Sequence, residues 1–430
     1  FDMTHAREVL MTSRKNCIKQ VSGSATEVLE ARMHRLHEEI ADYTALKDQI
    51  RTGLDQHDAI ASRRQRIQAA MGSTDRQWQD YRWQLVNRIT DAATLQAYLP
   101  LSPEETARIA RVAAQYRFAI SPYYLSLIDP DDPACPIRRQ AVPDQAELDP
   151  AGELDPMDEA GSTPVNGITR RYPDRLIVKV TNQCGMYCRF CQRRRLIGEQ
   201  DKHTPPHVLE QSLAYIRSHP EIRDVLLTGG DALMLSDARL DWLLGELRQI
   251  EHVEIIRIGS RTPVTLPQRI TPGLVKILRK YHPLYFNTHF NSPAEITKEA
   301  RQACALLADA GIPLGNQMVL LNGVNNDPFV VRKLNQQLLR IRVKPYYIFH
   351  AKQVRGTTHF WVKLEEGLEI MESLRGSTSG LAIPTYIVNG TGGLGKTPLL
   401  PNYLLYIGRE KAVFRNWQGQ IFEIDNSPPA

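Results

Sequence analysis

LIVKVTNQCGMYCRFCQRRR, residues 176–195, joins the two patterns that decide the fold of this chain. Its β-branched start, 176–181, predicts a buried strand. Cys184, Cys188 and Cys191 then follow in the spacing C-x3-C-x2-C. Clustered thiols in a chain of 430 residues indicate metal or redox chemistry, since disulfide frameworks are typical of short secreted proteins. The stretch therefore predicts a metal-binding loop directly after a strand.

Downstream of this loop, the sequence alternates between strand and helix patterns. The predicted strands are LIVKVT, DVLLTG, VEIIRIG, LYFNTHF, LGNQMVLL and KPYYIFH, and the helices between them include DARLDWLLGELRQI and EITKEARQACALLADAG. This alternation is typical of a parallel sheet covered by helices. We predict an α/β fold, a partial (β/α)6 TIM-like barrel over 171–380, with functional residues at the C-terminal ends of its strands.

The two flanks of the barrel differ from it. Residues 1–120 read as a helical region, in which apolar residues from Ser24 to Ile50 recur at steps of three and four. That apolar face packs either on the same subunit or on another one. Further helices are predicted over 78–90 and 102–116. The proline-dotted, acidic passage 121–170 predicts an extended connector over the surface, and 381–430 a short β-containing C-terminal segment.

Composition places few further limits on function. The chain is 42% hydrophobic and 23% charged, with a net charge of +5. These values suit an ordinary globular protein and do not indicate nucleic-acid binding. No apolar run approaches the roughly 20 residues that span a bilayer, and no signal pattern is visible. We expect a cytoplasmic protein with no membrane or nucleic-acid partner, and free thiols at Cys17, Cys135 and Cys304.

GTGGLGKT, Gly390 to Thr397, matches the phosphate-binding pattern G-x-x-x-x-G-K-[ST]. That loop needs a strand before it and a helix after it, because the helix N-terminus holds the phosphates. The strand IPTYIVN is predicted, but Pro401 would interrupt the helix. A P-loop nucleotide triphosphatase is therefore only a remote alternative, and the lysine of this loop needs another explanation.

Three thiolates on one loop can bind three irons of a [4Fe–4S] cluster and leave the fourth iron open. A zinc site would need a fourth ligand, which only a distant His or Cys304 could supply. With Tyr187 and Phe190 before the second and third cysteines, the motif resembles the radical S-adenosylmethionine superfamily. The resemblance implies a [4Fe–4S] cluster that binds and cleaves S-adenosylmethionine. It also implies that five further residues contact S-adenosylmethionine: Gly229, Gly230, Asp231, His289 and Gln317.

A closer resemblance runs from about residue 81 to residue 414. SPYYLSLIDPDDPACPIR, RRYPDR, CRFCQRRR, GIPLGNQMVLLNGVN and GGLGKTPLLPNY together resemble the lysine 2,3-aminomutase family. This implies a second cofactor, pyridoxal phosphate, bound as an aldimine to Lys396. It further implies that Arg171 and Arg175 lie at the pyridoxal phosphate end of the site and that Arg193 binds the substrate α-carboxylate. An adenosyl radical would then remove a β-hydrogen, and the amino group would migrate to the neighbouring carbon.

The substrate prediction depends on two departures from the lysine-specific relatives. Those enzymes hold the distant ammonium group of lysine with two aspartates, and the matching positions here are Lys352 and Asn389. Such a pair repels an ammonium group and attracts a carboxylate. The sequence therefore predicts interconversion of L-glutamate and β-glutamate, as in the glutamate-acting members of the family. The alternative is a lysine 2,3-aminomutase that acts on free or protein-bound lysine.

The resemblance also implies partners. An electron donor such as flavodoxin or ferredoxin is expected to reduce the cluster, and a homodimer or homotetramer is expected. The resemblance implies that lysine-specific relatives bind zinc through cysteines in a C-terminal tail and one in the barrel, whereas this chain has no cysteine after Cys304. We therefore predict no such zinc site.

Overall fold

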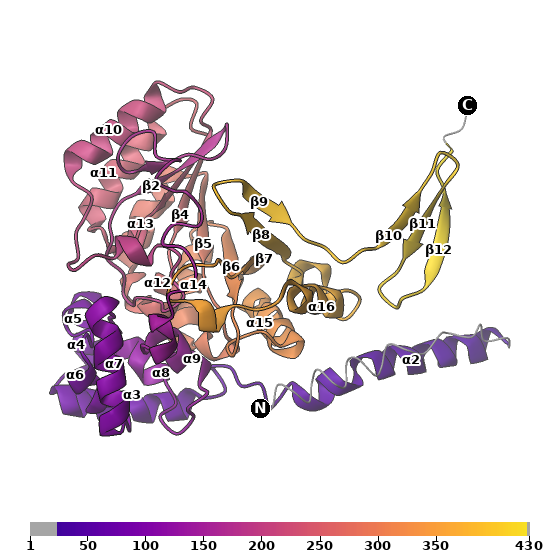
Figure 1. The fold of residues 1–430 in the computed structure, drawn as a ribbon, viewed down its shortest axis with the longest axis horizontal. Helices are drawn as coiled ribbons and strands as arrows, with labels where there is room; N and C mark the ends of the chain where they lie inside the picture. The colour runs from indigo at the N-terminus through magenta and orange to yellow at the C-terminus, as the bar shows by residue number, and fades with distance from the viewer. Residues whose placement is uncertain (1–23, 428–430) are drawn as a thin grey trace.

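The structure is a computed structural model that describes residues 24–427, so Cys17 lies outside the described residues. Its centre is a curled sheet with the strand order β1 to β9 (Figure 1). Strands β2 to β8 are all parallel, and β1 and β9 pair antiparallel at the two edges. The strands are β1 (Ile168–Thr169), β2 (Arg175–Lys179), β3 (Asp224–Thr228), β4 (Ile255–Gly259), β5 (Leu284–Thr288), β6 (Leu314–Leu320), β7 (Lys344–His350), β8 (Thr385–Gly390) and β9 (Gly395–Pro398).

The predicted partial barrel is confirmed, and all six predicted strands are present as β2 to β7. The segment IPTYIVN adds a seventh parallel strand, because β8 pairs with β7. Helices cover the outside of the sheet (Figure 1). They are α10 (Pro206–Arg217), α11 (Asp237–Arg248), α13 (Pro272–Leu278), α14 (Lys298–Asp309), α15 (Pro328–Arg340) and α16 (Leu364–Leu374).

Side chains alternate along the strands between the outer face of the barrel and its interior. In β2, β3 and β4, every second residue is buried and the residues between are only partly so. Outward residues such as Val178 and Ile256 are apolar and pack in the main core, whereas Lys179 and Arg257 line the interior. Since successive side chains of a strand point to opposite faces, this pattern gives an apolar outer face and an inner face that carries polar side chains beside apolar ones such as Ile177 and Leu226.

The helical N-terminal region is more broken than the sequence predicts. The single helix expected over 78–90 is two short ones, α4 (Asp75–Gln79) and α5 (Tyr81–Val86). Asp80 separates them because its backbone is extended, with ψ at 112°, and its side chain caps α5 through the Arg82 amide. The region also contains α2 (Ala25–Leu46), α3 (His57–Met71), α6 (Ala92–Gln96) and α7 (Pro103–Gln115).

The segment 121–170 is not the extended surface connector that the sequence predicts. All six residues of α8 (Pro122–Leu127) are buried, and α9 (Pro136–Ala141) follows. Two of the prolines that suggested a linker, Pro122 and Pro136, occupy first positions of helices, where proline needs no N–H partner. The acidic residues are not all solvated either, since fully buried Glu147 accepts from Arg189 Nη2 at 2.5 Å.

Two parts of the chain extend from the same side of the body, away from the barrel (Figure 1). One is α2, whose C-terminal end packs on α15 through Tyr43 and Phe329, with ring centroids 5.7 Å apart. Toward its N-terminus Leu29 is 56% exposed. The other is an antiparallel sheet of β10 (Leu404–Ile407), β11 (Lys411–Arg415) and β12 (Ile421–Asp425). None of the helices in residues 24–427 is long and apolar enough to cross a membrane.

The glycine-rich stretch Gly390 to Thr397 does not form a phosphate loop. It makes the tight turn and the second strand of a β8–β9 hairpin, and no helix follows it in the described chain up to residue 427. The nucleotide triphosphatase alternative is therefore wrong. In this hairpin Asn389 and Lys396 are direct cross-strand partners, so their side chains emerge on the same face.

Candidate functional site

One cavity of about 750 Å³ occupies the inside of the barrel. Its wall includes every residue to which the sequence analysis gave a role in binding or catalysis. They are Arg171, Arg175, Cys184, Cys188, Cys191, Arg193, Gly229, Gly230, Asp231, His289, Gln317, Lys352, Asn389 and Lys396. These residues lie between positions 171 and 396 of the sequence and meet because most of them follow or end parallel strands.

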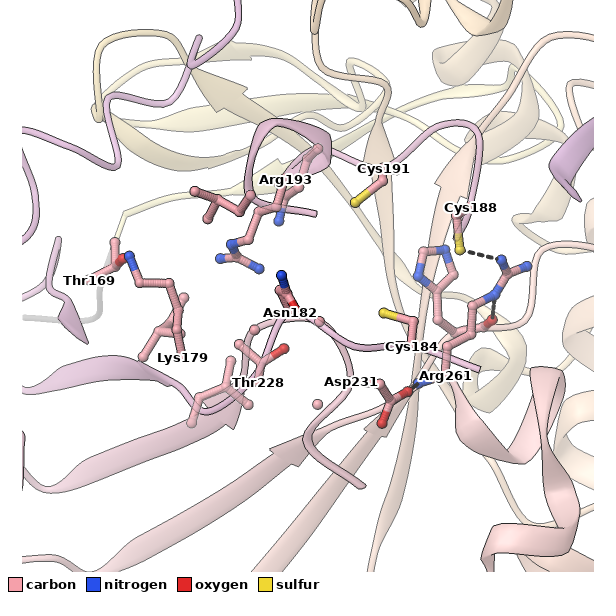
Figure 2. Close-up of a pocket in the computed structure, with 18 of the residues that line it drawn as sticks. Thr169, Lys179, Asn182, Cys184, Cys188, Cys191, Arg193, Thr228, Asp231 and Arg261 are labelled. Carbon is pink, nitrogen blue, oxygen red and sulfur yellow. Dashed lines mark hydrogen bonds between the residues drawn. The ribbon is translucent and has the colours of Figure 1, made fainter. Parts of the chain in front are cut away.

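The three cysteines follow β2 and line the cavity on one loop (Figure 2). Cys188 Sγ accepts a hydrogen bond from Arg261 Nη1 at 2.8 Å. Burial raises the pKa of the Cys184 and Cys191 thiols, and binding to metal would deprotonate them. Within residues 24–427, no group of three His, Cys, Asp or Glu side chains could hold a metal ion. A four-iron cluster ligates each cysteine through a different iron, so its thiolates need not meet at one point.

Residues of the helical N-terminal region contact this loop and hold it in place. Arg88 Nη1 donates to the backbone oxygen of Cys184 at 2.7 Å. Tyr187, between the first two cysteines, lies against the guanidinium groups of Arg88 and Arg117, at 5.8 and 4.6 Å from its ring centroid. Asp201 joins them, accepting from Arg117 Nη2 at 2.8 Å and from the hydroxyl of Tyr187. The aromatic residue in the cysteine motif thus anchors the loop to a separate part of the chain.

Gly229 and Gly230, after β3, are required by a close approach of two backbone segments. Gly229 has a φ of 135°, and a Cβ there would lie 2.4 Å from the oxygen of Thr181. A Cβ on Gly230 would lie 2.4 Å from the oxygen of Gln183. Asp231 N donates to that same oxygen at 2.8 Å. The glycines therefore let the loop after β3 pack on the start of the cysteine loop, a backbone role that the sequence analysis did not predict.

The Asp231 side chain is almost fully buried beside the cysteines. Its Oδ1 accepts from Ser260 Oγ at 2.7 Å, and its Oδ2 accepts from the Arg261 amide at 2.8 Å. His289 follows β5, and its Nε2 lies 3.0 Å from Asn291 Oδ1. Burial, with Arg261 nearby, lowers the pKa of His289 to about 3, so its ring is neutral at working pH.

Lys396 points into the other part of the cavity, among aromatic rings. Its Nζ lies 5.8 Å from the ring centroid of Tyr172, 5.6 Å from that of Tyr347 and 5.9 Å from that of Phe349. Burial, with Arg257 and Arg175 nearby, lowers the pKa of the Lys396 ammonium to about 8. A larger share of the amine is therefore unprotonated near neutral pH than for an exposed lysine, as carbonyl chemistry requires.

Lys352 and Asn389 line the same cavity as Lys396. Lys352 Nζ donates to Gln192 Oε1. Burial lowers the pKa of its ammonium to about 7, and the positive charge of Arg193 adds to this effect. The Nδ2 of Asn389 is buried without a hydrogen-bond partner among the described residues. A buried donor without a partner is costly, so this amide indicates a missing acceptor.

The donor set fits the two organic cofactors as well as the cluster. Besides Asn389, the Nε of Arg171 is buried without a partner among the described residues, and it faces the same cavity as Lys396. Two polar atoms of β5, Asn287 Nδ2 and Thr288 Oγ1, are unpaired in the same way on the cavity wall. Unpaired donors at both cavity regions are what a phosphate and a nucleoside would satisfy.

Five cavity residues were not predicted from the sequence: Lys179, Gln192, Arg257, Arg261 and Asn287. Glu159, which pairs with a cavity residue, was not predicted either. Glu159 binds Arg193, with Oε1 2.7 Å from its Nη2. Arg257 Nε donates to Asp224 Oδ1 at 2.7 Å near Lys396. Strand position could have indicated Lys179, Arg257 and Asn287, because each is a polar residue within a predicted strand. Nothing local marks Glu159 or Arg261.

Comparisons with known proteins agree with this site. A family model described as "Radical SAM superfamily" matches residues 178–331, and one described as "Lysine-2,3-aminomutase" matches residues 371–427. The first match covers the cysteine loop and β3 to β6, and the second covers the β8–β9 hairpin and the C-terminal sheet. The fold and the site thus define a radical S-adenosylmethionine enzyme.

Curated relatives define the family within that class. The chain is 53% identical over 404 residues to "Glutamate 2,3-aminomutase" of Clostridioides difficile (strain 630), covering 94% of this chain and 96% of the relative. It is 51% identical over 350 residues to "L-lysine 2,3-aminomutase" of Clostridium subterminale, covering 81% and 84%. Identity to "L-lysine 2,3-aminomutase" of Bacillus subtilis (strain 168) is 46% over 349 residues, covering 81% and 74%.

The chain belongs to the lysine 2,3-aminomutase family. It is therefore an isomerase, an aminomutase that acts on a small amino acid substrate. Family membership implies a [4Fe–4S] cluster, S-adenosylmethionine and pyridoxal phosphate as its cofactors.

Proposed function

We propose that this chain is a pyridoxal phosphate-dependent 2,3-aminomutase that interconverts L-glutamate and β-glutamate. The observation that carries the proposal is the pair Lys352 and Asn389, which faces the same cavity as Lys396 and the three cysteines. An ammonium group and an unpaired amide N–H can both donate to a carboxylate. The ammonium group of Lys352 cannot accept from the ammonium group of lysine and would repel it while charged, so only Asn389 Oδ1 could accept from it.

When bound, the cluster with S-adenosylmethionine supplies hydrogen-atom abstraction, and pyridoxal phosphate supplies the aldehyde that carries the amino group. In our proposal Lys396 attaches the aldehyde, Arg171 and Arg175 bind at the phosphate, and Arg193 binds the α-carboxylate. Lys352 and Asn389 bind the side-chain carboxylate, so a substrate is held at both ends. The cysteines bind the cluster, and S-adenosylmethionine is contacted by Gly229, Gly230, Asp231, His289 and Gln317.

The position of these groups suits radical chemistry. The cavity is enclosed by the barrel, and aromatic rings surround the Lys396 amine. A site that excludes water and fixes both ends of a substrate limits side reactions and orients the reacting carbon. The neutral ring of His289 adds no charge beside the cluster.

Lysine is the second candidate substrate. It is favoured by the names of several relatives, among them the proteins of Clostridium subterminale and Bacillus subtilis. Anaerobic incubation with each amino acid, cofactors and a chemical reductant, followed by product analysis, distinguishes the two. We expect β-glutamate from glutamate, and little or no β-lysine from lysine.

The pH dependence gives a separate test. Because the Lys352 ammonium has a pKa of about 7 before substrate binds, we expect kcat/KM for glutamate to fall as pH rises through about 7, by roughly tenfold per unit. A bound carboxylate raises that pKa, so kcat should stay nearly level over the same range. In Lys352→Arg the side chain stays charged over this range, so the fall of kcat/KM with rising pH should disappear. An unchanged limb in Lys352→Arg would assign it to another group.

Lys396 should carry the cofactor. Loss of solvation inside the cavity and the nearby cations Arg257 and Arg175 lower the pKa of its amine to about 8, which favours reaction with an aldehyde near neutral pH. Borohydride reduction and peptide mapping should therefore place pyridoxyl phosphate on Lys396. Lys276→Ala, at an exposed lysine of α13, is the matched control and should leave labelling unchanged. A label found mainly on another lysine would remove Lys396 from this role.

We also propose the partners expected from the family. The cluster receives its electron from a small protein such as flavodoxin or ferredoxin in the cytoplasm. The chain forms a homodimer or homotetramer, for which the exposed apolar residues of the two extensions are the support: Leu29, Met33, Leu405, Tyr406, Ile407 and Ile421. Light scattering at several protein concentrations tests this assembly.

A further inference from the structure

Glu159 lies in the segment that the sequence predicts as a surface connector, yet only 4% of it is exposed. Its carboxylate faces Arg193. Arg193 Nε lies 2.9 Å from Oε1 and 3.1 Å from Oε2, and Arg193 Nη2 lies 2.7 Å from Oε1. Burial alone would raise the pKa of the Glu159 carboxyl, but Arg193 outweighs burial and lowers it below its usual value. The two side chains therefore form a charged pair.

A guanidinium group has two edges that can each bind a carboxylate. Glu159 occupies the Nε and Nη2 edge of Arg193, and no hydrogen bond from Nη1 to a described residue accompanies it. Figure 2 shows the guanidinium group of Arg193 extending into the cavity. The edge that contains Nη1 is thus left for a carboxylate that enters the cavity.

The segment that carries Glu159 is itself tied to the cofactor end of the site. The oxygen of Pro156 accepts from the Gly392 amide at 2.9 Å, in the turn before Lys396. The oxygen of Met157 accepts from Arg171 Nη2 at 2.6 Å. Thr163 Oγ1 donates to the oxygen of Glu159 at 2.6 Å. These bonds fix Glu159, and through it Arg193, relative to the β8–β9 hairpin.

We propose that Glu159 is a positioning residue that holds Arg193 by one edge so that the other edge receives the α-carboxylate of the substrate. The inference rests on the proposed role of Arg193 but not on which amino acid reacts. Glu159 acts through Arg193 and does not itself touch the substrate. Its negative charge also favours the protonated form of Lys352, so it links the two substrate-binding groups.

Glu159→Asp separates position from charge, because it keeps the carboxylate but shortens its reach by one methylene group. We expect the Kd of the holoenzyme for glutamate to rise by roughly tenfold, since small misplacements of a binding group are costly. The Kd is read from the visible absorbance of the bound pyridoxal phosphate, without S-adenosylmethionine and without turnover. The probe that lacks an α-carboxylate, 4-aminobutanoate, should bind with an unchanged Kd.

Asp155→Asn is the matched control. Asp155 belongs to the same segment and pairs with Arg195 at 2.7 Å, so this change loosens the segment without touching Arg193. Its Kd for glutamate should stay near that of the unaltered protein. In Glu159→Gln, which keeps the shape and loses the charge, the falling limb of kcat/KM assigned to Lys352 should move to lower pH.

Two results would overturn the inference. One is an unchanged or lower Kd for glutamate in Glu159→Asp, which would mean that Glu159 does not position Arg193 or competes with the substrate. The other is an equal loss for glutamate and 4-aminobutanoate, which would indicate a general structural effect. If the unaltered protein acts on lysine instead, the same comparison with lysine and 1,5-diaminopentane tests the role of Glu159. Failure of the substrate proposal can therefore be distinguished from failure of the positioning role of Glu159.

Discussion

Cys188→Ala should bring aminomutation to background and remove most of the brown colour of the anaerobic protein. Three of the four irons each need a thiolate ligand from the protein, and the fourth iron is left open for S-adenosylmethionine. Loss of one leaves two, and the cluster is released or degraded. Iron and sulfide content, visible absorbance and electron paramagnetic resonance after reconstitution measure the loss, and cleavage of S-adenosylmethionine measures the activity.

Cys304→Ala is the control for this change. Cys304 is buried in the main core on α14, and burial raises the pKa of its thiol to about 12, so it is an inert thiol. This variant should reconstitute a full cluster, although the lost sulfur will lower stability by about 1 kcal/mol or more. A Cys188→Ala protein that keeps four irons and cleaves S-adenosylmethionine would show that the loop does not bind the cluster.

The double change Lys352→Asp with Asn389→Asp should reverse the charge preference of the substrate site. A buried ammonium group facing a carboxylate is worth about 2–3 kcal/mol or more, and two facing like charges cost a similar amount. Glutamate turnover should therefore fall by more than roughly a hundredfold, at about 1.4 kcal/mol per factor of ten. Lysine turnover should rise by less, because gaining activity needs correct geometry as well as charge.

Lys276→Asp is the surface control for this charge change, because Lys276 is exposed on α13 and does not line the cavity. It should leave both activities within about twofold. Kinetic constants for glutamate and lysine in the unaltered protein, the double variant and the Lys276→Asp control, measured anaerobically, make the comparison. If the unaltered protein converts lysine to β-lysine faster than glutamate to β-glutamate, the substrate proposal fails and the lysine alternative holds.

Much of the barrel could be predicted because its signals are local. The stretch KPYYIFH coincides with β7, and the other five predicted strands differ from β2 to β6 by a few residues at the ends. The candidate site residues meet in one cavity because most of them end strands, and parallel strands bring their C-terminal ends to one edge. Cys135 and Cys304 are buried free thiols, as predicted.

What could not be predicted depends on contacts between distant positions. Arg261 meets Cys188 across 73 residues, and Glu159 meets Arg193 across 34. In neither pair does the sequence around one residue indicate which residue it contacts. The prediction of an extended connector over 121–170 is wrong for a different reason. Proline is common in linkers but also at helix starts, and acidic residues are common in linkers but also occur in buried ion pairs.

The pairing of Asn389 with Lys396 across the β8–β9 hairpin fixes the distance between these two residues through the main chain. Directly opposite residues of antiparallel strands keep their Cα atoms about 4.5–5.5 Å apart, and the hydrogen bonds of the hairpin maintain that spacing. In our proposal Lys396 attaches the cofactor and Asn389 binds the far end of the substrate, so the spacing between these two functions is a property of strand register. Preference for the charge of a substrate can therefore change through single side-chain substitutions. Preference for the length of a substrate can change only if the register of the hairpin changes.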